Sequence, residues 1–498
     1  MSGGERPVNV LLVVADELMA AALPAYGGSQ VDTPAMDRLA ATGTTFDRAY
    51  CNSPVCTPSR YSMLSGRYAW SMHVYHNQSP TPSGYPSLAG RLSDRGYDTV
   101  GIGKMHFKGD DQMWGYASRP YGDFGGLSHQ PDPLPTAPRL SYIADAGPAD
   151  IDDADQHDVI VGRMGCEYLQ ARDPAEPFFL HLSFNFPHYP LRPPKRLFDR
   201  YYPARADLPR RRDRPEREHP WMRERRAVYR DLIRDGSFGD EQIRRARAAY
   251  YACIALVDEQ LGRVLDVLDE RGLAGNTLVL FAADHGEMLG EHGTWEKNCF
   301  YEQSARVPLI VRLPGQGLGR RVGDVVELVD IVPTVEALTG GSADGGDGES
   351  LLPLIDGRGR RVKDYAISEL APTYVQGVAR MVRRGRWKYI AYDNASPSLF
   401  DLDADPDELD DLGLDGDVAM PELAELAATD FDRVQAESRS ADRAVHPSYA
   451  DMAPNQYRTA DGSLADAEQF YECPSWTRPT RVAEPRITRV RPEAPTAP

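Results

Sequence analysis

The sequence lacks any apolar run of about 20 residues, the length that a membrane-spanning helix requires. It has only six cysteines in 498 residues, and their spacing fits neither a disulfide scaffold nor a zinc-ligand set. An excess of positive charge is absent too, and the net charge of -18 argues against a nucleic-acid footprint and against attraction to anionic membranes. What remains is the composition of a folded globular protein, with 41% hydrophobic and 26% charged residues.

An export signal is not evident at the start of the sequence. The apolar run at 8–15 is short, and it lacks the basic flank and the small-residue cleavage pattern of a signal peptide. We therefore expect a β-strand at this position and a cytoplasmic protein with reduced thiols. We expect neither a membrane nor a nucleic acid as a partner, and the oligomeric state stays open, with a homo-oligomer as one option.

The alternation of short β-branched runs with helical stretches predicts an α/β fold with a large, mainly parallel sheet flanked by helices. Near Lys363 the pattern changes to strand-like segments followed by an acidic helical stretch, which predicts a small α+β domain with an antiparallel sheet. We therefore divide the chain into a catalytic domain, 1–362, and a C-terminal domain with a Pro-rich tail, 363–498. The clearest strands of the first domain are predicted at 8–15, 99–102, 178–184, 277–282 and 308–313.

A long helix is predicted after Asp240, which we expect to be its N-cap, and Gly272 is expected to end it. An Arg-rich stretch, 192–247, precedes this helix and overlaps its start. Because Asp and Glu residues are interleaved with the arginines, this stretch indicates a solvated lid or insertion and not a nucleic-acid patch.

Polar residues follow four of the predicted strands, at the sheet edge where open α/β folds bind their ligands. Since the carboxyl ends of neighbouring parallel strands meet at one edge, we expect these side chains to lie close together. In chain order they are Asp16 and Glu17, Lys104 and His106, His188, and Asp284 and His285.

Three carboxylates and one imidazole in this set predict a metal site. Asp16, Glu17 and Asp284 would repel one another if they were packed together, and their pKa values would rise. A hard divalent cation removes that penalty, and oxygen-rich ligands favour calcium or magnesium over zinc. We expect His285 to complete the ligand set, and the choice between the two ions stays open.

Cys56 lies in the segment PVCTPSRYSMLSGRY at 54–68. Thr57 fits an N-cap and Pro58 a first helical position, so we expect a helix to begin directly after Cys56. The amides of a helix N-terminus favour anions, and Arg60 lies one turn further with a guanidinium able to hold an oxyanion. A catalytic thiolate is one interpretation of Cys56, but a soft thiolate is mismatched to a hard cation.

The run CTPSR at 56–60 resembles the C-x-P-S-R motif of type I sulfatases, which belong to the alkaline phosphatase superfamily. GKMH at 103–106, DHG at 284–286, Lys297 and Asp16 match further blocks of the family in the family's order. The resemblance covers nearly the whole chain and implies an alkaline-phosphatase-like sandwich as the fold.

For the cofactors, the resemblance implies that a formylglycine-generating maturation enzyme oxidises Cys56 to formylglycine. An oxygen of that residue would then bind a divalent metal, calcium first, with magnesium or manganese as alternatives. Glu17 stands where an aspartate is more common in the family. The other metal ligands that the resemblance implies are Asp16, Glu17, Asp284 and His285.

For catalysis, the resemblance implies that Arg60 and Lys104 steady the formylglycine hydrate and that His106 helps to expel sulfate. Lys104, His188 and Lys297 would bind the sulfate oxygens. The hydrate would supply the nucleophile, and its second hydroxyl would let sulfate depart when the aldehyde reforms.

The function that we expect is the hydrolysis of a small alkyl or aryl sulfate ester. Within the family, 103–115 and 293–311 most resemble choline-sulfatase-like enzymes, so choline sulfate is one candidate. Candidate contacts of the leaving group are Asn77, Trp114, Tyr116 and Glu369.

Two alternatives remain open. The first is a phosphonate monoester or phosphodiester hydrolase of the same superfamily, because phosphoryl and sulfuryl groups are nearly isosteric. The second is a non-catalytic binding protein in which Cys56 is never matured.

Overall fold

The computed structural model of the chain describes residues 6–122, 141–211, 217–234, 238–342, 345–371, 377–415, 420–428, 431–443, 456–458 and 464–466. Most of the predicted Pro-rich tail lies outside the described residues. None of the described helices is both long and apolar enough to cross a bilayer.

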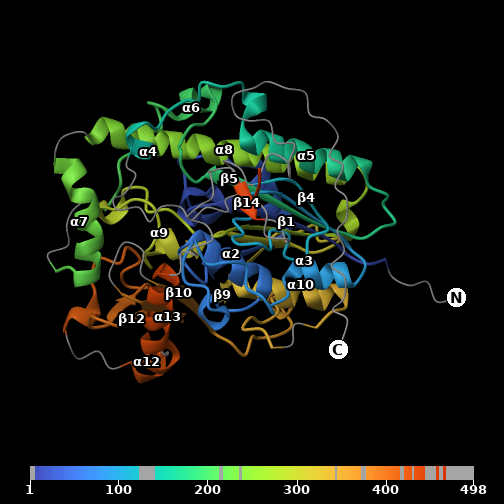
Figure 1. Cartoon of the computed structure of the whole chain (residues 1–498). Coiled ribbons are helices and arrows are strands. Elements are labelled where there is room, and N and C mark those ends of the chain that lie inside the picture. Colours follow the sequence, from blue (N-terminus) through green and yellow to red (C-terminus); the bar gives the residue numbers. More distant parts are fainter. Residues whose placement is uncertain are drawn as a thin grey trace.

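A nine-stranded sheet forms the centre of the protein (Figure 1). Its strands are β1 (Asn9–Asp16), β2 (Thr44–Tyr50), β3 (Asp98–Gly103), β4 (Ser118–Tyr121), β5 (Phe178–Pro187), β6 (Thr277–Ala283), β7 (Arg306–Val307), β8 (Leu309–Arg312) and β9 (Arg320–Glu327). The strand order is β4-β3-β5-β1-β6-β8-β2-β7, and β9 pairs with β2. All pairs from β4 to β6 are parallel, whereas β8 is antiparallel to both of its neighbours. The sheet is therefore mainly parallel, as the sequence predicts.

The central strands are buried along their whole length because helices cover both faces of the sheet. Every residue of β1, β5 and β6 is buried, which is typical of parallel strands inside an α/β sandwich. Val10 of β1 lies opposite Phe179 of β5 and Leu278 of β6, and this register continues to the ends of the three strands. The strands predicted from the sequence are confirmed, with ends that shift by at most three residues.

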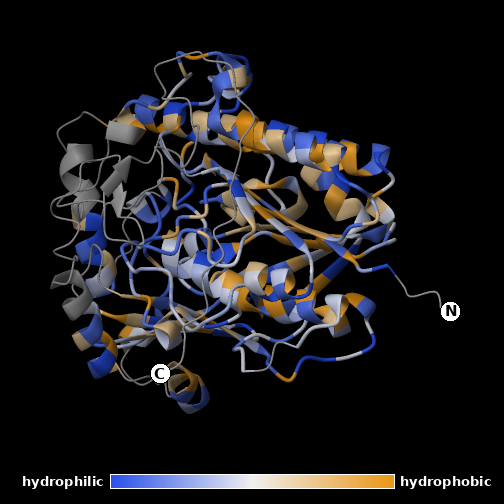
Figure 2. Ribbon diagram, turned by 45° about the vertical axis from the view of Figure 1, so that its right-hand side comes forward, coloured by the Kyte–Doolittle hydropathy of each residue, from blue (hydrophilic) through white to orange (hydrophobic). Residues whose placement is uncertain are grey.

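Helices α5 and α8 cover one face of the sheet, and α2, α3 and α10 lie on the other face (Figure 1). Figure 2 shows the hydrophobic strands enclosed between helices whose outer sides are largely hydrophilic. The helices are α1 (Pro34–Thr42), α2 (Cys56–Ser65), α3 (Leu88–Asp94), α4 (Ser141–Ala144), α5 (His157–Ala171), α6 (Lys195–Tyr201), α7 (Pro220–Arg234), α8 (Asp240–Glu270), α9 (Glu302–Ala305), α10 (Ile331–Thr339), α11 (Leu352–Asp356), α12 (Pro421–Ala427) and α13 (Phe431–Arg443).

The long helix α8 begins one residue earlier than the sequence suggests. Gly239 is the N-cap, and Asp240 is the first helical residue, so the predicted cap is wrong by one position. The backbone N–H of Gly239 donates to Oε1 of Gln242 at 3.0 Å, and the carboxylate of Asp240 lies in the first turn, where it favours the helix dipole. Gly272 has a φ of 65° directly after the helix, as expected of a residue that ends it.

A second, smaller sheet follows in the chain and is antiparallel throughout. Helix α12 contacts its two middle strands. Its strands are β10 (Tyr365–Leu370), β11 (Ala379–Arg384), β12 (Trp387–Tyr392) and β13 (Ser398–Asp401), and a separate pair, β14 (Gln456–Arg458) and β15 (Leu464–Asp466), follows. The domain division at 362 stays a prediction, but this antiparallel sheet was expected from the sequence.

Candidate active site

Four neighbouring strands, in the order β3-β5-β1-β6, deliver the predicted polar residues to one edge of the sheet. β1 ends at Asp16, β3 is followed by Lys104, β5 by His188 and β6 by Asp284. The backbone N–H of Glu17 donates to Asp284 Oδ1 at 3.1 Å, which ties the ends of β1 and β6 together. The convergence predicted from the strand ends is therefore present in the structure.

Cys56 enters this edge as the first residue of α2. Val55 is the N-cap residue and makes no side-chain cap bond, so the predicted cap at Thr57 is wrong. The reason is that Asn77 caps the helix from a distant segment, because its Oδ1 accepts the backbone N–H of Thr57 at 2.9 Å. Pro58 consequently lies at the third helical position.

Four buried side chains at this edge could hold a metal ion: Asp16, Cys56, Asp284 and His285. One ligand atom from each lies within 4.8 Å of all the others. Sγ of Cys56 lies 3.1 Å from Nε2 of His285 and 4.0 Å from Oδ1 of Asp16. Two carboxylates, an imidazole and a cysteine in one buried cluster fit a divalent cation that compensates the charge of the carboxylates.

Arg60 bridges the two aspartates of this cluster. Its Nε lies 2.8 Å from Oδ2 of Asp284, and its Nη2 lies 3.0 Å from Oδ2 of Asp16. Nη1 donates to Oγ of Ser183 at 2.8 Å and to the carbonyl of Lys104. The guanidinium is only 1% exposed and fixes the orientation of both carboxylates, which the sequence did not predict for it.

Glu17 points away from this cluster toward two residues that were predicted to bind sulfate. Its Oε2 lies 2.8 Å from Nζ of Lys297 and 3.3 Å from Nε2 of His188. Lys297 also lies over the ring of Tyr189, at 5.0 Å from the centroid. Among the described residues, Glu17 belongs with Asp16 and His188 to a second group that could hold a metal ion, whereas Cys56, Asp284 and His285 form the first group with Asp16.

Lys104 and His106 follow a glycine whose conformation no other residue adopts easily. Gly103 has a φ of 92°, and a Cβ on it would lie 2.1 Å from the carbonyl oxygen of Ser183. This close approach lets the backbone N–H of Lys104 donate to the same carbonyl at 2.9 Å, and Nζ of Lys104 then pairs with Asp16. His106 is 9% exposed, and its carbonyl accepts the hydroxyl of Thr57 at 3.2 Å.

The electrostatics of the site favour a protonated thiol and neutral imidazoles. Burial raises the pKa of the Cys56 thiol to about 12, against the opposing charges of Lys297 and Lys104. Burial lowers the pKa of His106 and of His188 well below the ordinary value, and Lys104 adds to both effects. An unmodified Cys56 is therefore a poor nucleophile at neutral pH.

The carboxyl groups of the site differ from one another. Burial by itself raises the pKa of Asp16, but Lys104, His188 and Arg60 outweigh it and hold that pKa well below its usual range. Burial raises the pKa of Glu17 well above its usual range, and the ammonium of Lys297 opposes that rise. Asp16 is thus held in its ionised form, which is the form of a carboxyl group that binds a cation.

The four predicted leaving-group contacts have partners inside the protein. Asn77 caps α2, and Nε1 of Trp114 donates to the carbonyl of Tyr85 at 3.0 Å. The hydroxyl of Tyr116 lies 2.7 Å from Nδ1 of His181, and Glu369 accepts the backbone N–H of Trp70 at 2.9 Å. These contacts give each of the four side chains a structural role.

The sulfatase family model matches residues 8–341, which include the metal cluster and all the predicted catalytic residues. The chain belongs to the sulfatase family. A second model, for the C-terminal part of N-sulphoglucosamine sulphohydrolase, matches residues 290–434 of this sulfatase-family enzyme. The enzyme is therefore a hydrolase of sulfate esters, and its family implies a metal and a formylglycine at the buried Asp/Cys/His cluster.

Similar proteins include the choline-sulfatase of Rhizobium meliloti, which is 32% identical over 426 residues, covering 81% of this chain and 82% of the relative. The arylsulfatase of Clostridium perfringens is 30% identical over 442 residues, covering 81% and 90%. The crystal structure of the phosphonate monoester hydrolase of Agrobacterium radiobacter has a TM-score of 0.68 at 24% identity, covering 93% of this chain and 99% of that one, and shows the shared fold.

Sequence reasoning missed several residues that support this sulfatase site. Tyr250 of α8 donates its hydroxyl to the carbonyl of Glu17 at 2.7 Å, and Arg225 of α7 donates to the carbonyls of Trp295 and Lys297. Ser183, in the middle of β5, holds Arg60. A tyrosine in a buried helix and a serine in a buried strand look like ordinary core residues, so no sequence signal marks them.

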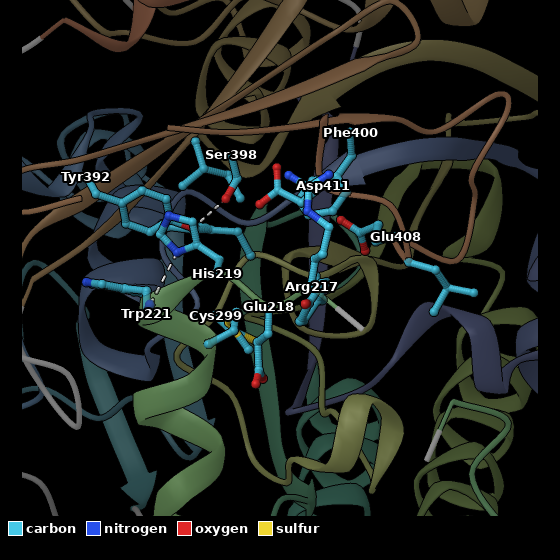
Figure 3. A pocket seen from close by; sticks show the side chains of 15 residues that line it. Arg217, Glu218, His219, Trp221, Cys299, Tyr392, Ser398, Phe400, Glu408 and Asp411 are labelled. Carbon is cyan, nitrogen blue, oxygen red and sulfur yellow. Dashed lines mark hydrogen bonds between the residues drawn. The ribbon is translucent and has the colours of Figure 1, made fainter. Parts of the chain in front are cut away.

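A separate pocket lies between the start of α7 and the second sheet (Figure 3). His219, Trp221 and Tyr392 form one side of it, and Glu408 and Asp411 lie on another. None of the predicted site residues lines it.

Proposed function

We propose that the protein hydrolyses a small alkyl or aryl sulfate ester by means of a formylglycine derived from Cys56 and a divalent metal, calcium in the first place. The observation that carries the proposal is the position of Cys56, at the start of α2 and within 4.8 Å of ligand atoms of Asp16, Asp284 and His285. The net reaction adds water across the S–O bond of the ester and releases an alcohol, sulfate and a proton.

The residues around Cys56 support this chemistry through their charge and position. When bound, the metal would supply positive charge that activates the nucleophile and neutralises the sulfuryl oxygens. Nζ of Lys104 pairs with Asp16 of the cluster, and Nζ of Lys297 pairs with the adjacent Glu17. We propose that both ammonium groups bind the oxygens of a sulfuryl group held at residue 56. His106, which is buried, and His188, which is partly buried, are neutral bases that can hold or move a proton beside the lysines.

The residues that could contact the alcohol part of the ester bear on the substrate class. Choline sulfate is a candidate because a choline-sulfatase is among the similar proteins. Trp114 and Tyr116, which could have contributed to an aromatic cage for a quaternary ammonium, are instead packed in the core. We therefore propose a small alkyl or aryl sulfate, with choline sulfate as one member of the class to be assayed. We further propose that the enzyme acts in the cytoplasm with a maturation enzyme as its partner.

The proposal is tested by co-expression with a formylglycine-generating enzyme, followed by mass spectrometry of the peptide that contains residue 56. We expect the mass loss that accompanies conversion of the thiol to an aldehyde, together with release of sulfate from para-nitrophenyl sulfate. Cys56→Ala is expected to lower turnover by at least about a thousandfold with an unchanged circular dichroism spectrum. Undiminished turnover by that variant would refute the role of residue 56.

The same preparation also tests the alternatives. A para-nitrophenyl phosphonate ester cleaved fast, with an inert sulfate ester, would identify a phosphonate hydrolase. An unmodified thiol after co-expression, with no turnover of either ester, would identify a binding protein.

A further inference from the structure

We propose that the protein has a second oxyanion site, separate from the active site, which takes a small tetrahedral anion such as sulfate or phosphate. The juxtaposition that carries it is three guanidinium groups around one cavity, those of Arg48, Arg306 and Arg383. The cavity has a volume of about 690 Å³ and lies where β2 and β7 of the large sheet meet β11 of the second sheet. None of the predicted site residues is among the described residues that line it, so a ligand there would be bound independently of the proposed reaction.

The register of β2 and β7 brings two of these guanidinium groups to the same side of the large sheet. Arg48 and Tyr50 are two residues apart on β2, so their side chains leave the same face. Arg306 of β7 lies directly opposite Tyr50 in the antiparallel pair and shares that face. Arg48 and Arg306 therefore reach the cavity from neighbouring strands.

Arg383 reaches the cavity from the second sheet and meets Arg48 there. Its Nε donates to the hydroxyl of Tyr50 at 2.9 Å, and its Nη1 donates to the carbonyl of Gly385. Nη1 of Arg48 donates to the same carbonyl at 3.4 Å, so the two guanidinium groups converge on one oxygen.

The charge of Arg383 is not compensated by a direct partner. The residue is 2% exposed, and its side chain contacts only the hydroxyl of Tyr50 and the carbonyls of Gly385 and Trp387 among the described residues. A buried cation without an anionic partner is costly, and an anion bound in the cavity would lower that cost.

The carboxylates that line the cavity leave donors of the other two arginines available. Oε2 of Glu302 lies 3.6 Å from Nε of Arg306, and Oδ1 of Asp403 lies 3.7 Å from Nη2 of Arg48. A well-formed bond between a guanidinium and a carboxylate is about 2.7–2.9 Å long, so both pairs are loose. An oxyanion in the cavity could therefore bind these donors at a shorter distance.

The other charged groups near the cavity have direct partners of opposite sign. Arg211, which also lines it, pairs with Asp407 and Glu291, and Lys388 pairs with Glu302 and Glu408. An anion would thus be held by the position of the three guanidinium groups and not by an excess of positive charge over the wider region.

A neutral polar side chain adds to this lining. Gln303 of α9 is 6% exposed, and its buried Oε1 has no hydrogen-bond partner among the described residues. A buried amide oxygen without a partner is unfavourable. Rotation of the amide by 180° would direct its NH2 group, which has two donors, toward an anion in the cavity.

The test is titration calorimetry of the full chain at constant ionic strength in sodium chloride, with sodium sulfate and sodium phosphate as the two ligands. We expect Arg48→Gln and Arg306→Gln each to weaken the binding by at least about tenfold, because each removes a charged donor. Arg48→Lys keeps the charge and should lose less affinity than Arg48→Gln. The ratio of the two dissociation constants of the wild type shows which anion the site prefers.

Two control variants separate this cavity from the active site and from surface charge. Lys104→Gln removes an ammonium group of the active site, and Arg38→Gln removes an exposed pair with Asp266. Both should bind the anion at the cavity as the wild type does. Circular dichroism checks the folding of each variant, and we expect the arginine variants to fold because the side chains of Arg48 and Arg306 are 39% and 25% exposed.

The proposal is overturned if the wild type binds neither anion, or if binding survives both glutamine substitutions of the arginines. It is also overturned if Lys104→Gln abolishes all binding, because the anion would then occupy the active site. A protein that binds the anion at the cavity and cleaves no sulfate ester would refute the proposed function and leave the second site in place.

Discussion

The adjacent residues Asp16 and Glu17 have different contacts because the backbone directs their side chains to different parts of the site. Asp16 ends β1 and contributes a strongly acidic carboxylate to the metal cluster, whereas Glu17 turns toward Lys297. Two histidines further along the chain also differ in role. Nε2 of His285 lies 3.1 Å from Sγ of Cys56, whereas His292 is buried near Arg211, Arg226 and Lys388. Residue type alone does not decide whether a buried histidine serves the site or the stability of the fold.

The burial of His292 should make the stability of the protein depend on pH. Its ring is 2% exposed and stacks on Tyr301, with centroids 3.9 Å apart and planes 6° from parallel. Burial lowers the pKa of His292 to about 3, and Arg211 and Arg226 lower it further. Between about pH 6.5 and pH 3 the unfolded chain therefore binds a proton that the folded protein does not, so stability falls as the pH falls through this window.

His292→Phe keeps an aromatic ring on Tyr301 and removes the titration. We expect the wild type to lose about 2 kcal/mol more of its free energy of unfolding than the variant between about pH 7.5 and about pH 5. Urea unfolding at the two pH values measures this difference. The same loss in both proteins would mean that His292 is not the group that titrates.

At the scale of single elements, the strand ends carry most of what the sequence could predict. Buried parallel strands appear in the sequence as continuous apolar runs, so β1, β3, β5 and β6 and the polar residues after them were found from pattern alone. The destination of Glu17 and the caps of α2 and α8 were not. The destination of Glu17 and the cap of α2 depend on bonds between segments far apart in the chain, from Tyr250 to Glu17 and from Thr57 to Asn77. The cap of α8 is local, because the N–H of Gly239 donates to the side chain of Gln242.

Gly103, at the end of β3, is a residue whose substitution should lower both stability and activity. Gly103→Ala would place a Cβ 2.1 Å from the carbonyl oxygen of Ser183 and keep an unfavourable φ of 92°. We expect a loss of about 3 kcal/mol or more in the free energy of unfolding, because both a clash and backbone strain are introduced. We also expect a fall in kcat/KM, because Lys104 is held by the same carbonyl.

Gly96 is the matched control for this variant. Its φ is 83°, but a Cβ there would meet nothing within 4 Å. Gly96→Ala should therefore cost about 1–2 kcal/mol of strain and leave kcat/KM unchanged. Thermal unfolding and turnover of para-nitrophenyl sulfate compare the two, and an equal effect of both substitutions would rule out the clash as the cause.

At the scale of the whole molecule, the second sheet is joined to the catalytic part through a buried charge cluster. Lys388 of β12 is fully buried, and its Nζ lies 2.8 Å from Glu302 of α9 and 2.6 Å from Glu408. It also donates to the carbonyl of Phe300 at 2.7 Å, three residues beyond Lys297. Glu408 lines the pocket between α7 and the second sheet (Figure 3). Through Glu408 and Phe300, Lys388 therefore connects the sheet with this pocket and with the loop that carries Lys297.

This connection predicts that the two sheets unfold together. Lys388→Met keeps most of the side-chain volume but leaves Glu302 and Glu408 buried without their shared cation, which should cost about 3–5 kcal/mol. We expect one unfolding transition, shifted to lower denaturant, when far-ultraviolet circular dichroism and tryptophan fluorescence are followed together. Lys195→Met, which removes an exposed pair with Asp199, should change stability by less than about 1 kcal/mol. Two separate transitions in the wild type would show that the second sheet is an independent unit, and the buried lysine would then not couple it to the active site.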